Sequence, residues 1–502
     1  MSSLATVIPH FISGQRTEPT SGRTADVYDP STGQVQAQVA LASKAEVDAA
    51  IASAAAAQPG WAALNPQKRA RILVKFVDLL YQHKDELAVL LSSEHGKTVE
   101  DAKGDLQRGI EVAEFASGIP HLLKGEYTDS AGTGIDVYSM RQPLGVVAGI
   151  TPFNFPAMIP LWKLAPAIAA GNTFVLKPSE RDPSVPMRIA ELALEAGMPP
   201  GVLNVVNGDK EAVDAILDSP VVQAVGFVGS TPIAQYIYER AAATGKRAQC
   251  FGGAKNHAIV MPDADMDVVV DALIGAAYGS AGERCMAISV AVPVGEETAD
   301  KLIAALIPKV RELTVGAPTD PASDYGPLVT RDALERVTGY IQQGVDEGAE
   351  LVVDGREGEI AGDPDGFYVA GSLFDRVQPH HKVYLEEIFG PVLSVIRAAS
   401  FDEALGLAND HEYGNGVAIF TRDGHTAREF ARRVQAGMIG VNVPIPVPIA
   451  YHTFGGWKAS AFGDLNQHGP DSIRFYTRTK TVTSRWPTAP DEGSAFVMPQ
   501  MG

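Results

Sequence analysis

Cysteine is scarce in this sequence, because Cys250 and Cys285 are the only 2 among 502 residues. Two thiols cannot build a disulfide framework or a zinc site of four thiolates, so we expect a reducing compartment and no bound metal. The chain also lacks a charged N-terminal segment followed by an apolar one, and it lacks a run of about 18 apolar residues. Export and membrane spanning are therefore disfavoured, and a cytoplasmic protein is expected.

Clusters of Lys and Arg are lacking as well. The chain has 41 basic and 60 acidic residues, which gives a formal net charge of −19. A nucleic-acid partner is disfavoured because contacts to phosphates need clustered positive charge, and acidity of this size more often serves solubility. The 45% hydrophobic and 20% charged residues are typical of a folded protein. Since one core stops growing at roughly 250 to 300 residues, we expect at least two domains.

Short apolar strands alternate with helical segments from Pro143 to about residue 250, and Gly or Pro marks the joints. Nearly continuous apolar runs at 174–176 and 202–206 indicate a parallel sheet that is covered on both faces. This region is therefore predicted to be a doubly wound, Rossmann-like domain. Before it, apolar residues at helical spacing predict amphipathic helices within 44–58 and 68–96.

A second α/β region is predicted from about residue 258 to 440, with helices over 266–279 and 300–313. The Pro-rich stretch 440–451 is unsuited to a helix. The tail 473–484 alternates β-branched and polar residues as an exposed strand does. Exposed strands usually find a partner, so a homo-oligomer is expected.

Cys285 is the first residue that could carry chemistry, and it lies in Gly-Ser-Ala-Gly-Glu-Arg-Cys-Met directly after an apolar helical run. The glycines let the backbone approach a ligand, and the neighbouring Arg284 favours the thiolate that acts as a nucleophile. A lone cysteine in a long chain is more often a small buried apolar residue. That is our interpretation of Cys250, which lies on a predicted buried strand.

Asn154 lies in Thr-Pro-Phe-Asn-Phe-Pro, a proline-stiffened turn that follows a buried strand. A rigidly held amide is a good oxyanion donor, although an Asx-turn would explain the residue without function. The segment 226–232 ends a strand and opens a helix, so its free N–H groups would suit a pyrophosphate. The alternative is an ordinary turn capped by Ser230 or Thr231.

Lys177 and Glu180 follow the next strand, at the carboxyl edge where open α/β sheets bind ligands. An ammonium and a carboxylate there could hold the two hydroxyls of a ribose. A surface ion pair is the competing interpretation.

These segments, with a glycine-rich stretch before Lys255 and Glu-Glu-Ile-Phe-Gly-Pro at 386–391, resemble the aldehyde dehydrogenase superfamily over essentially the whole chain. The resemblance implies that Cys285 is the nucleophile and that Asn154 and the Cys285 N–H form the oxyanion hole. It also implies a cofactor-binding set: Lys177 and Glu180 at the adenine ribose, Ser230 at the pyrophosphate, Glu387 and Phe389 at the nicotinamide ribose, and Phe153, Arg181 and Gly252. A carboxylate at Glu180 should repel a 2′-phosphate, which favours NAD over NADP.

The domain organisation implied by the resemblance has three parts. Residues 1–126 and 146–253 would form the NAD-binding domain, and residues 254–445 the catalytic domain. Residues 127–145 and 473–490 would supply the strands of a small β element through which a dimer or homotetramer assembles.

One departure from the family pattern concerns water activation. Hydrolytic members carry Glu-Leu-Gly-Gly-Lys, in which the Glu is a general base, but here Phe251 stands at the Glu position before Lys255. A second family Glu also lacks a counterpart, since Gln467 falls approximately there. Positioned acid–base groups are worth about 10² to 10⁴ in rate, so a thioester on Cys285 should hydrolyse slowly. A thiol with a pKa of roughly 8.5 needs less help, which favours acyl transfer to coenzyme A.

Segments 253–257, 282–287 and 443–458 resemble the CoA-acylating branch in particular. That branch acts on malonate and methylmalonate semialdehydes in valine, β-alanine and inositol catabolism, and it gives acetyl-CoA or propionyl-CoA with loss of CO₂. The substrate carboxylate would need an arginine, because a guanidinium matches its two oxygens. Arg108 and Arg284 are the candidates, and each could equally form a structural ion pair.

The aldehyde pocket would be lined by Trp162 and Phe454, although core packing explains either aromatic side chain. Two other functions stay open from the sequence. The first is a hydrolytic NAD-dependent aldehyde dehydrogenase with an unrecognised base and a free acid as product. The second is a cofactor-binding protein without catalysis, against which the intact nucleophile and oxyanion donor argue.

Overall fold

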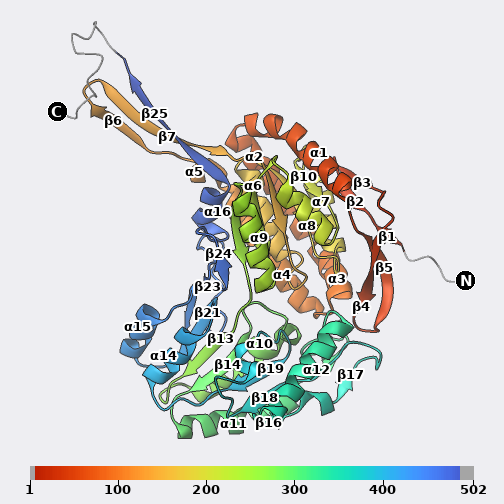
Figure 1. The fold of residues 1–502 in the computed structure, drawn as a ribbon, viewed down its shortest axis with the longest axis vertical. Coiled ribbons are helices and arrows are strands. Elements are labelled where there is room, and N and C mark those ends of the chain that lie inside the picture. Colours follow the sequence, from red (N-terminus) through yellow and green to blue (C-terminus); the bar gives the residue numbers. More distant parts are fainter. Residues whose placement is uncertain (1–5, 487–502) are drawn as a thin grey trace, which may run out of the picture.

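The structure is a computed structural model that describes residues 6–486. It consists of two α/β lobes, each built on its own large sheet, and an arm of three strands that projects from the body (Figure 1). This arrangement confirms the α/β prediction. Within the described range, no helix combines the length and the apolar composition needed to cross a bilayer.

The upper lobe in Figure 1 is organised by an 8-stranded sheet with the order β24-β12-β11-β8-β9-β10-β2-β3. Its central strands are parallel. They are β8 (Val146–Ile150), β9 (Thr173–Lys177), β10 (Leu203–Val205), β11 (Val222–Val228) and β12 (Arg247–Phe251). The antiparallel edges are β2 (His10–Ile12), β3 (Gln15–Thr17) and β24 (Ala461–Phe462). The predicted doubly wound sheet is thus confirmed.

Helices cover both faces of this sheet because successive strand residues point to two different apolar cores. Val147 and Phe174 face one core, and Val146 and Val175 face the other. The first core includes α2 (Pro66–Gln82), α3 (Lys84–His95), α4 (Val99–Ser117), α6 (Met158–Ala169) and α7 (Ser184–Glu195). The second includes α1 (Lys44–Ala63), α8 (Lys210–Asp218) and α9 (Thr231–Ala243).

The lower lobe is built on a 7-stranded sheet with the order β16-β18-β19-β14-β13-β21-β22. Its parallel strands are β13 (Asn256–Val260), β14 (Ile288–Pro293), β18 (Ser372–Asp375), β19 (Val392–Val395), β21 (Gly416–Phe420) and β22 (Met438–Val441), and β16 (Glu350–Val353) is the antiparallel edge. Its helices are α10 (Met266–Tyr278), α11 (Glu296–Arg311), α12 (Arg331–Asp346), α14 (Phe401–Asp410) and α15 (Gly424–Arg433). The second α/β region is therefore confirmed, and the domain boundary between residues 253 and 254 stays a proposal.

The short elements complete the chain. A 3-stranded sheet holds β1 (Val7–Ile8), β5 (Gln34–Ala40) and β4 (Thr24–Asp29). The others are α5 (Ile119–Leu122), α13 (Lys382–Leu385), η2 (Gly355–Glu357), and the strand pairs β15 (Val315–Gly316) with β17 (Ile360–Ala361) and β20 (Tyr413–Gly414) with β23 (Trp457–Lys458). The helical stretch predicted over 68–96 is divided between α2 and α3, because the chain turns at His83.

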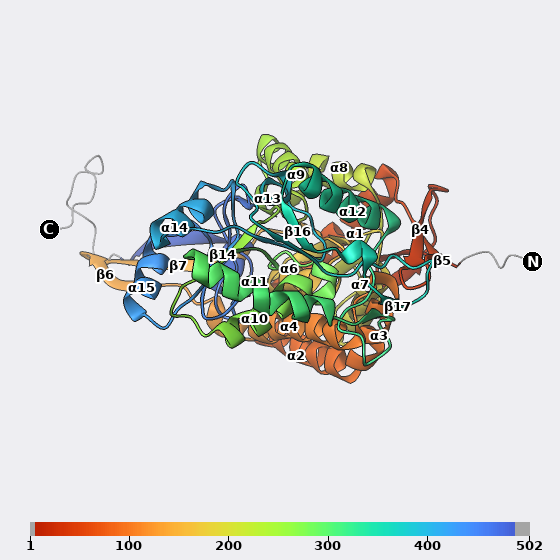
Figure 2. The same cartoon turned by 90° about the horizontal axis from the view of Figure 1, so that it is seen from below.

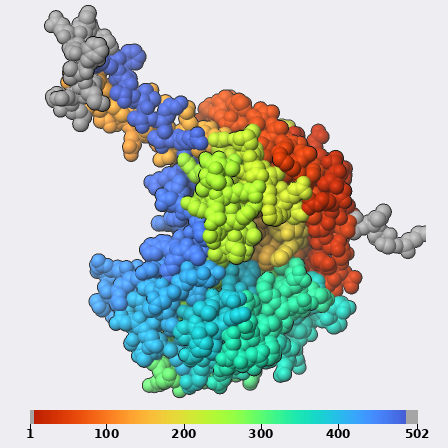
Figure 3. Space-filling model, in the orientation of Figure 1, coloured from red at the N-terminus to blue at the C-terminus, as the bar shows by residue number. Residues whose placement is uncertain are grey.

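The arm consists of β6 (Tyr127–Gly132), β7 (Ile135–Pro143) and β25 (Thr477–Arg485) in the order β25-β7-β6. β25 pairs with β7 along its whole length, and Figure 3 shows the arm standing clear of the two lobes. The strand expected from residue 473 begins only at Thr477, because Gly469–Phe475 forms helix α16 with a proline in its first turn. Residues 487–490 of that expected strand lie outside the described range, as do residues 1–5 of the expected NAD-binding domain.

Helix α4 packs directly against α6 and lies beside α2 and α3 (Figure 2). The close approach depends on Gly109, since a Cβ there would lie 2.7 Å from Leu161 Cδ1 and 3.0 Å from Met158 Cα. Helix α6 is buried on every side. The two helices therefore form a rigid layer behind the carboxyl edge of the upper sheet.

Lys163 is the one charged residue in α6, and it is 1% exposed. Its Nζ donates to Gln467 Oε1 at 3.0 Å, and within residues 6–486 it has no carboxylate in an ion pair. Burial lowers the pKa of this amine to about 7, with a small opposing effect of Cys250. The neutral amine is therefore stabilised relative to the ammonium.

Replacing Lys163 with Met should change how stability depends on pH. Between about pH 7 and pH 10, Lys163 is protonated in the unfolded chain but not in the folded chain. The contribution of this lysine to the unfolding free energy of the parent therefore rises with pH. The cost of the lysine is fully present below that window. Denaturant titrations across the window should show a smaller rise in Lys163→Met, reduced by the contribution of one lysine while that of Lys255 remains, whereas the exposed control Lys301→Met should keep the full rise. An unchanged slope in Lys163→Met would contradict the assignment.

Candidate active site

The nucleophile segment (residues 279–287) leaves α10 through the 3-10 turn η1 (Gly279–Gly282). Ser280, Ala281 and Gly282 have φ values of 56°, 51° and 71°, a left-handed run that costs energy at the two non-glycine positions. A Cβ at Gly282 would overlap the carbonyl of Gly390. The turn therefore lies backbone to backbone against the segment 386–391.

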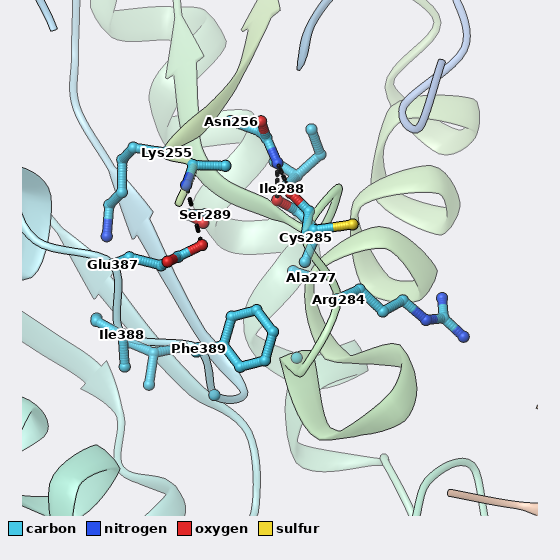
Figure 4. A pocket seen from close by; sticks show the side chains of 15 residues that line it. Lys255, Asn256, Ala277, Arg284, Cys285, Ile288, Ser289, Glu387, Ile388 and Phe389 are labelled. Carbon is cyan, nitrogen blue, oxygen red and sulfur yellow. Dashed lines mark hydrogen bonds between the residues drawn. The ribbon is translucent and has the colours of Figure 1, made fainter. Parts of the chain in front are cut away.

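Cys285 is oriented by two amide side chains. Its carbonyl accepts from Asn256 Nδ2 at 3.0 Å and from Asn415 Nδ2 at 3.1 Å (Figure 4 shows the Asn256 bond). Asn256 also donates to Ala287 O at 2.9 Å and accepts from the Gly416 N–H at 3.0 Å. Sequence reasoning missed both asparagines, although a polar residue at the start of a predicted buried strand was a usable signal for Asn256.

The Cys285 thiol is not pre-ionised in this state. Burial raises its pKa to about 12, the negative charge of Glu387 adds to that rise, and the N–H groups of Cys285 and Met286 and the charge of Lys97 oppose it. The expectation that Arg284 favours the thiolate is wrong here, because Arg284 Nη2 binds Asp101 Oδ1 at 2.6 Å.

A small pocket beside Cys285 brings three predicted segments together. Its lining includes Lys255, Cys285, Glu387 and Phe389. In Figure 4 the side chains of Lys255, Glu387 and Phe389 lie on one side of the nucleophile segment and the guanidinium of Arg284 on the other. Segments of the lower lobe that are about 30 and 100 residues apart along the chain thus share one cavity.

Glu387 and Lys255 are both shifted towards their neutral forms. The Ala254 N–H donates to Glu387 Oε1 at 3.0 Å, and Lys255 Nζ donates to the carbonyl of Glu386 at 2.8 Å. Burial raises the pKa of Glu387 to about 7 and lowers the pKa of Lys255 to about 7, and each of the two charges partly offsets the shift of the other. Glu387 is therefore a carboxyl group that can exchange a proton near neutral pH.

Asn154 lies in the oxyanion loop (residues 151–157), which joins β8 to α6, and it is 2% exposed. Its carbonyl accepts from Lys97 Nζ at 2.7 Å. Among the described residues its side-chain amide has no hydrogen-bond partner, so the Asx-turn alternative is not realised. Phe155 of this loop and Cys285 pack against the same apolar cluster, which brings the oxyanion loop and the nucleophile segment to one part of the fold.

Ser230 occupies the N-cap position of α9 but makes no capping hydrogen bond. Thr231 Oγ1 instead accepts from the Gly253 N–H at 2.8 Å. A Cβ at Gly252 would lie 2.7 Å from the same Thr231 oxygen, so only glycine fits this approach. Pro232 has no N–H, and the Ile233 N–H donates to the Ser230 carbonyl at 3.1 Å. The helix N-terminus therefore offers an anion its dipole and the Ser230 hydroxyl.

Lys177 and Glu180 form a pair of 3.0 Å at the end of β9, with the Glu180 side chain 39% exposed. The Phe153 ring lies between the Arg181 guanidinium, 4.8 Å from its centroid, and the Phe389 ring, at 5.9 Å. These contacts link the predicted cofactor residues of the upper lobe to those of the lower lobe. The set fits a dinucleotide, since it offers ribose-binding polar groups, a helix N-terminus and a pocket beside Cys285.

The two arginines proposed for a substrate carboxylate lie in different surroundings. Arg284 is paired with Asp101, whereas Arg108 Nη1 binds Glu111 Oε2 at 3.0 Å and its Nη2 donates to the carbonyl of Pro448 at 2.7 Å. Arg108 therefore reaches the Pro-rich segment (residues 443–458). Neither guanidinium is without a partner in this state.

Phe251 belongs to an aromatic wall formed with Trp162 and Phe454 beside Cys285. The Trp162 and Phe454 rings lie 5.4 Å apart, and the Phe251 and Phe454 rings lie 5.9 Å apart. Behind it, Lys163 Nζ lies 5.8 Å from the Phe251 ring centroid. The wall places an apolar surface where a hydrolytic enzyme would need a carboxylate.

Comparisons with known proteins show the family of the chain. A model of the aldehyde dehydrogenase family matches residues 17–482. A malonate-semialdehyde dehydrogenase of Pseudomonas aeruginosa is 58% identical over 493 residues, which cover 98% of this chain and 99% of that protein. A solved structure described as a methylmalonate-semialdehyde dehydrogenase from Sinorhizobium meliloti 1021, complexed with NAD, has a TM-score of 0.96 and 63% identity over 97% of this chain and 99% of that one. The methylmalonate-semialdehyde dehydrogenase from Oceanimonas doudoroffii has a TM-score of 0.95 and 56% identity over 96% and 99%.

Gly282→Ala should lower kcat by about 10²-fold, because the added methyl group forces the nucleophile segment away from Gly390 and a misplacement near 1 Å costs that much. Gly275→Ala is the matched control, since a Cβ at this α10 position meets nothing within 4 Å. The control should keep its turnover and gain about 0.5 to 1 kcal/mol of stability. Steady-state NADH formation measures kcat, and thermal unfolding measures stability. Equal kcat values for the two variants would contradict the close contact between Gly282 and Gly390.

Proposed function

Because the chain belongs to the aldehyde dehydrogenase family, we propose that it is an NAD-dependent, CoA-acylating dehydrogenase of malonate or methylmalonate semialdehyde. The observation that carries the proposal is the aromatic wall, in which Phe251 takes the place of the Glu of hydrolytic members. Glu387, the carboxyl group that lines the pocket with Cys285, is held by the Ala254 N–H. The names of its relatives at 58% and 63% identity support the substrate class. The NAD-bound relative supports the choice of cofactor.

The reaction starts when the Cys285 thiol releases its proton to solvent and its sulfur forms a bond to the aldehyde carbon. The carbonyl oxygen becomes an oxyanion, which the Asn154 amide and the Cys285 N–H stabilise by hydrogen bonds. NAD supplies the hydride acceptor. Return of the electron pair from oxygen to carbon as the hydride leaves gives the Cys285 thioester.

The second half of the reaction transfers the acyl group. The thiol of coenzyme A attacks the thioester carbon, its sulfur–carbon bond forms, and the Cys285 sulfur leaves. The proton of the coenzyme A thiol passes to the Cys285 sulfur. The β-carboxylate of the acyl group leaves as CO₂, the electron pair of the broken carbon–carbon bond passes to the α-carbon, and this carbon takes up a proton. The overall balance for malonate semialdehyde is semialdehyde, NAD⁺ and coenzyme A to acetyl-CoA, CO₂ and NADH. The methylmalonate analogue gives propionyl-CoA.

The cofactor would be held by the residues that the geometry gathers around α9 and β9. Lys177 and Glu180 are proposed at the adenine ribose and Ser230 at the pyrophosphate. The remaining contacts are proposed for Phe153, Arg181, Gly252, Glu387 and Phe389. The N-terminus of α9 supports this arrangement.

The substrate carboxylate is proposed to bind Arg108 or Arg284. Arg108 has the more favourable surroundings, because two of its contacts are to main-chain carbonyls of the Pro-rich segment rather than to a charge. Arg284 would have to give up its ion pair with Asp101.

Assembly through the arm and a cytoplasmic location complete the proposal. In the described part of the chain β25 is an edge strand with nine residues paired on one side only, and its outward-facing residues are mostly exposed. An edge of this length is suited to a second copy, in a dimer or a tetramer.

A hydrolytic enzyme is the second candidate, and Glu387 is the observation that favours it. Its pKa of about 7 and its influence on the Cys285 thiol make it a possible base for water. To act so, the carboxylate would have to leave the Ala254 N–H.

Turnover with and without coenzyme A separates these candidates. We expect NADH formation from malonate semialdehyde to fall by about 10² or more when coenzyme A is omitted, since no positioned base activates water. Cys285→Ala should abolish turnover in both conditions. Free acid as the product, full activity without coenzyme A and its loss in Glu387→Gln would select the hydrolytic candidate, and an inactive parent would favour a protein that only binds the cofactor.

Glu180→Gln tests the cofactor assignment. Removing the negative charge should lower the KM for NADP several-fold and leave kcat with NAD nearly unchanged, because a carboxylate repels a 2′-phosphate at close range. The comparison is made by steady-state kinetics with both cofactors. Glu191→Gln, at a carboxylate of α7 paired with Arg16, is the control and should leave the preference for NAD intact. No change in the NADP constants of Glu180→Gln would remove Glu180 from the ribose site.

A further inference from the structure

Helix α4 presents three charged side chains on one face. Asp101, Asp105 and Arg108 are spaced four and three residues apart, which places them in one row along a helix. Each contacts a different segment of the site. Asp101 binds Arg284 of the nucleophile segment, Asp105 binds the first residue of α6 directly after the oxyanion loop, and Arg108 binds the Pro-rich segment.

The contact at Asp105 is a buried ion pair. The side chains of Lys97 and Asp105 are each 0% exposed, and Lys97 Nζ lies 3.3 Å from Asp105 Oδ2. Asp105 Oδ1 accepts from the Met158 N–H at 2.7 Å. Lys97 Nζ donates to the carbonyl of Asn154 at 2.7 Å and lies 4.2 Å from the centroid of the Phe155 ring.

The pair therefore ties the oxyanion loop at two points, at Asn154 and at the first residue of α6. The loop has no regular secondary structure of its own. Lys97 is itself fixed, because its N–H donates to His95 Nδ1 at 3.2 Å and its carbonyl accepts from Ser92 Oγ at 2.7 Å. Lys97 and helix α4 thus support the oxyanion loop, which has no regular secondary structure to fix its position.

Stability alone is a poor explanation of such a pair. Taking two charges out of water costs free energy that their attraction often fails to recover, so a buried ion pair is weak evidence for a stabilising role. Its directional hydrogen bonds, by contrast, define where the Asn154 peptide lies. An oxyanion donor is effective only within a narrow range of positions, which gives this geometry a chemical use.

We propose that Lys97 and Asp105 are positioning residues that hold the Asn154 amide in the oxyanion hole, and that α4 sets its placement relative to Cys285 through Asp101 and Arg284. This rests on the proposed function only in assuming that Cys285 attacks an aldehyde. Arg284 then acts first as an anchor of the nucleophile segment. The pair touches no substrate, so its effect passes through Asn154.

A double-mutant cycle tests the proposal, with Lys97→Met, Asn154→Ala and the double variant compared in NADH formation. We expect Lys97→Met to lower kcat by about 10²-fold, the loss typical of one oxyanion donor, while KM for NAD and the Kd of NAD stay within about twofold. In the Asn154→Ala background the same substitution should cost less than about threefold, because the amide that it positions is already gone. Equal losses in both backgrounds, or an unchanged kcat in Lys97→Met, would overturn the proposal.

Two further variants guard against a folding defect. Asp105→Asn keeps an oxygen that can accept from the Met158 N–H, so it should recover at least part of the kcat that Asp105→Ala loses. Lys103→Met, on the same helix at an exposed position paired with Glu100, is the matched control and should leave kcat unchanged. NAD binding by fluorescence and circular dichroism show whether each variant is folded, and no difference between Asp105→Asn and Asp105→Ala would contradict the role of the hydrogen bond.

The outcome also stays separate from that of the proposed function. The same oxyanion forms whether water or coenzyme A accepts the acyl group, so the cycle can be measured if the coenzyme A requirement fails. An active parent with additive losses in the cycle would reject the positioning role alone.

Discussion

The carbonyl oxygen of Cys285 accepts hydrogen bonds from the amides of Asn256 and Asn415, which come from the first strand of the lower sheet and from the loop before β21. These bonds fix the direction of the Cys285 peptide, and with it the direction of the side chain that the site is built around. The left-handed turn of Ser280 and Ala281 stays in place because it is held from both ends, by this anchor and by the contact of Gly282 with Gly390.

Charge inside this site behaves differently from charge at the surface. The chain has a formal net charge of −19, but burial draws Lys163, Lys255 and Glu387 towards neutrality near pH 7. The site can therefore contain several buried titratable groups that are largely neutral near pH 7. Burial also raises the pKa of Asp105 to about 6, although the charge of Lys97 and the Met158 N–H oppose that rise.

The sequence predicted the two sheets because fully buried parallel strands are short, continuous apolar runs, and such runs are visible without a structure. The resemblance also implied that Cys285, Glu387 and Phe389 belong to one site, and these three residues line one pocket. It could not predict that Lys97 meets Asn154, since 57 residues separate them and no local pattern encodes the contact. The raised pKa of Cys285 was missed for the same reason, because burial depends on the whole fold. The break at His83 and the short helix before β25 are boundary details that periodicity resolves poorly.

The contact between Gly282 and Gly390 has a mechanical consequence. The two main chains touch with no side chain between them. A movement of the segment that carries Glu387 and Phe389 therefore displaces the nucleophile turn. A ligand that displaces Phe389 therefore also displaces the backbone next to Cys285, with no flexible side chain in between. Binding of a ligand at the segment 386–391 in this way affects the position of the nucleophile segment.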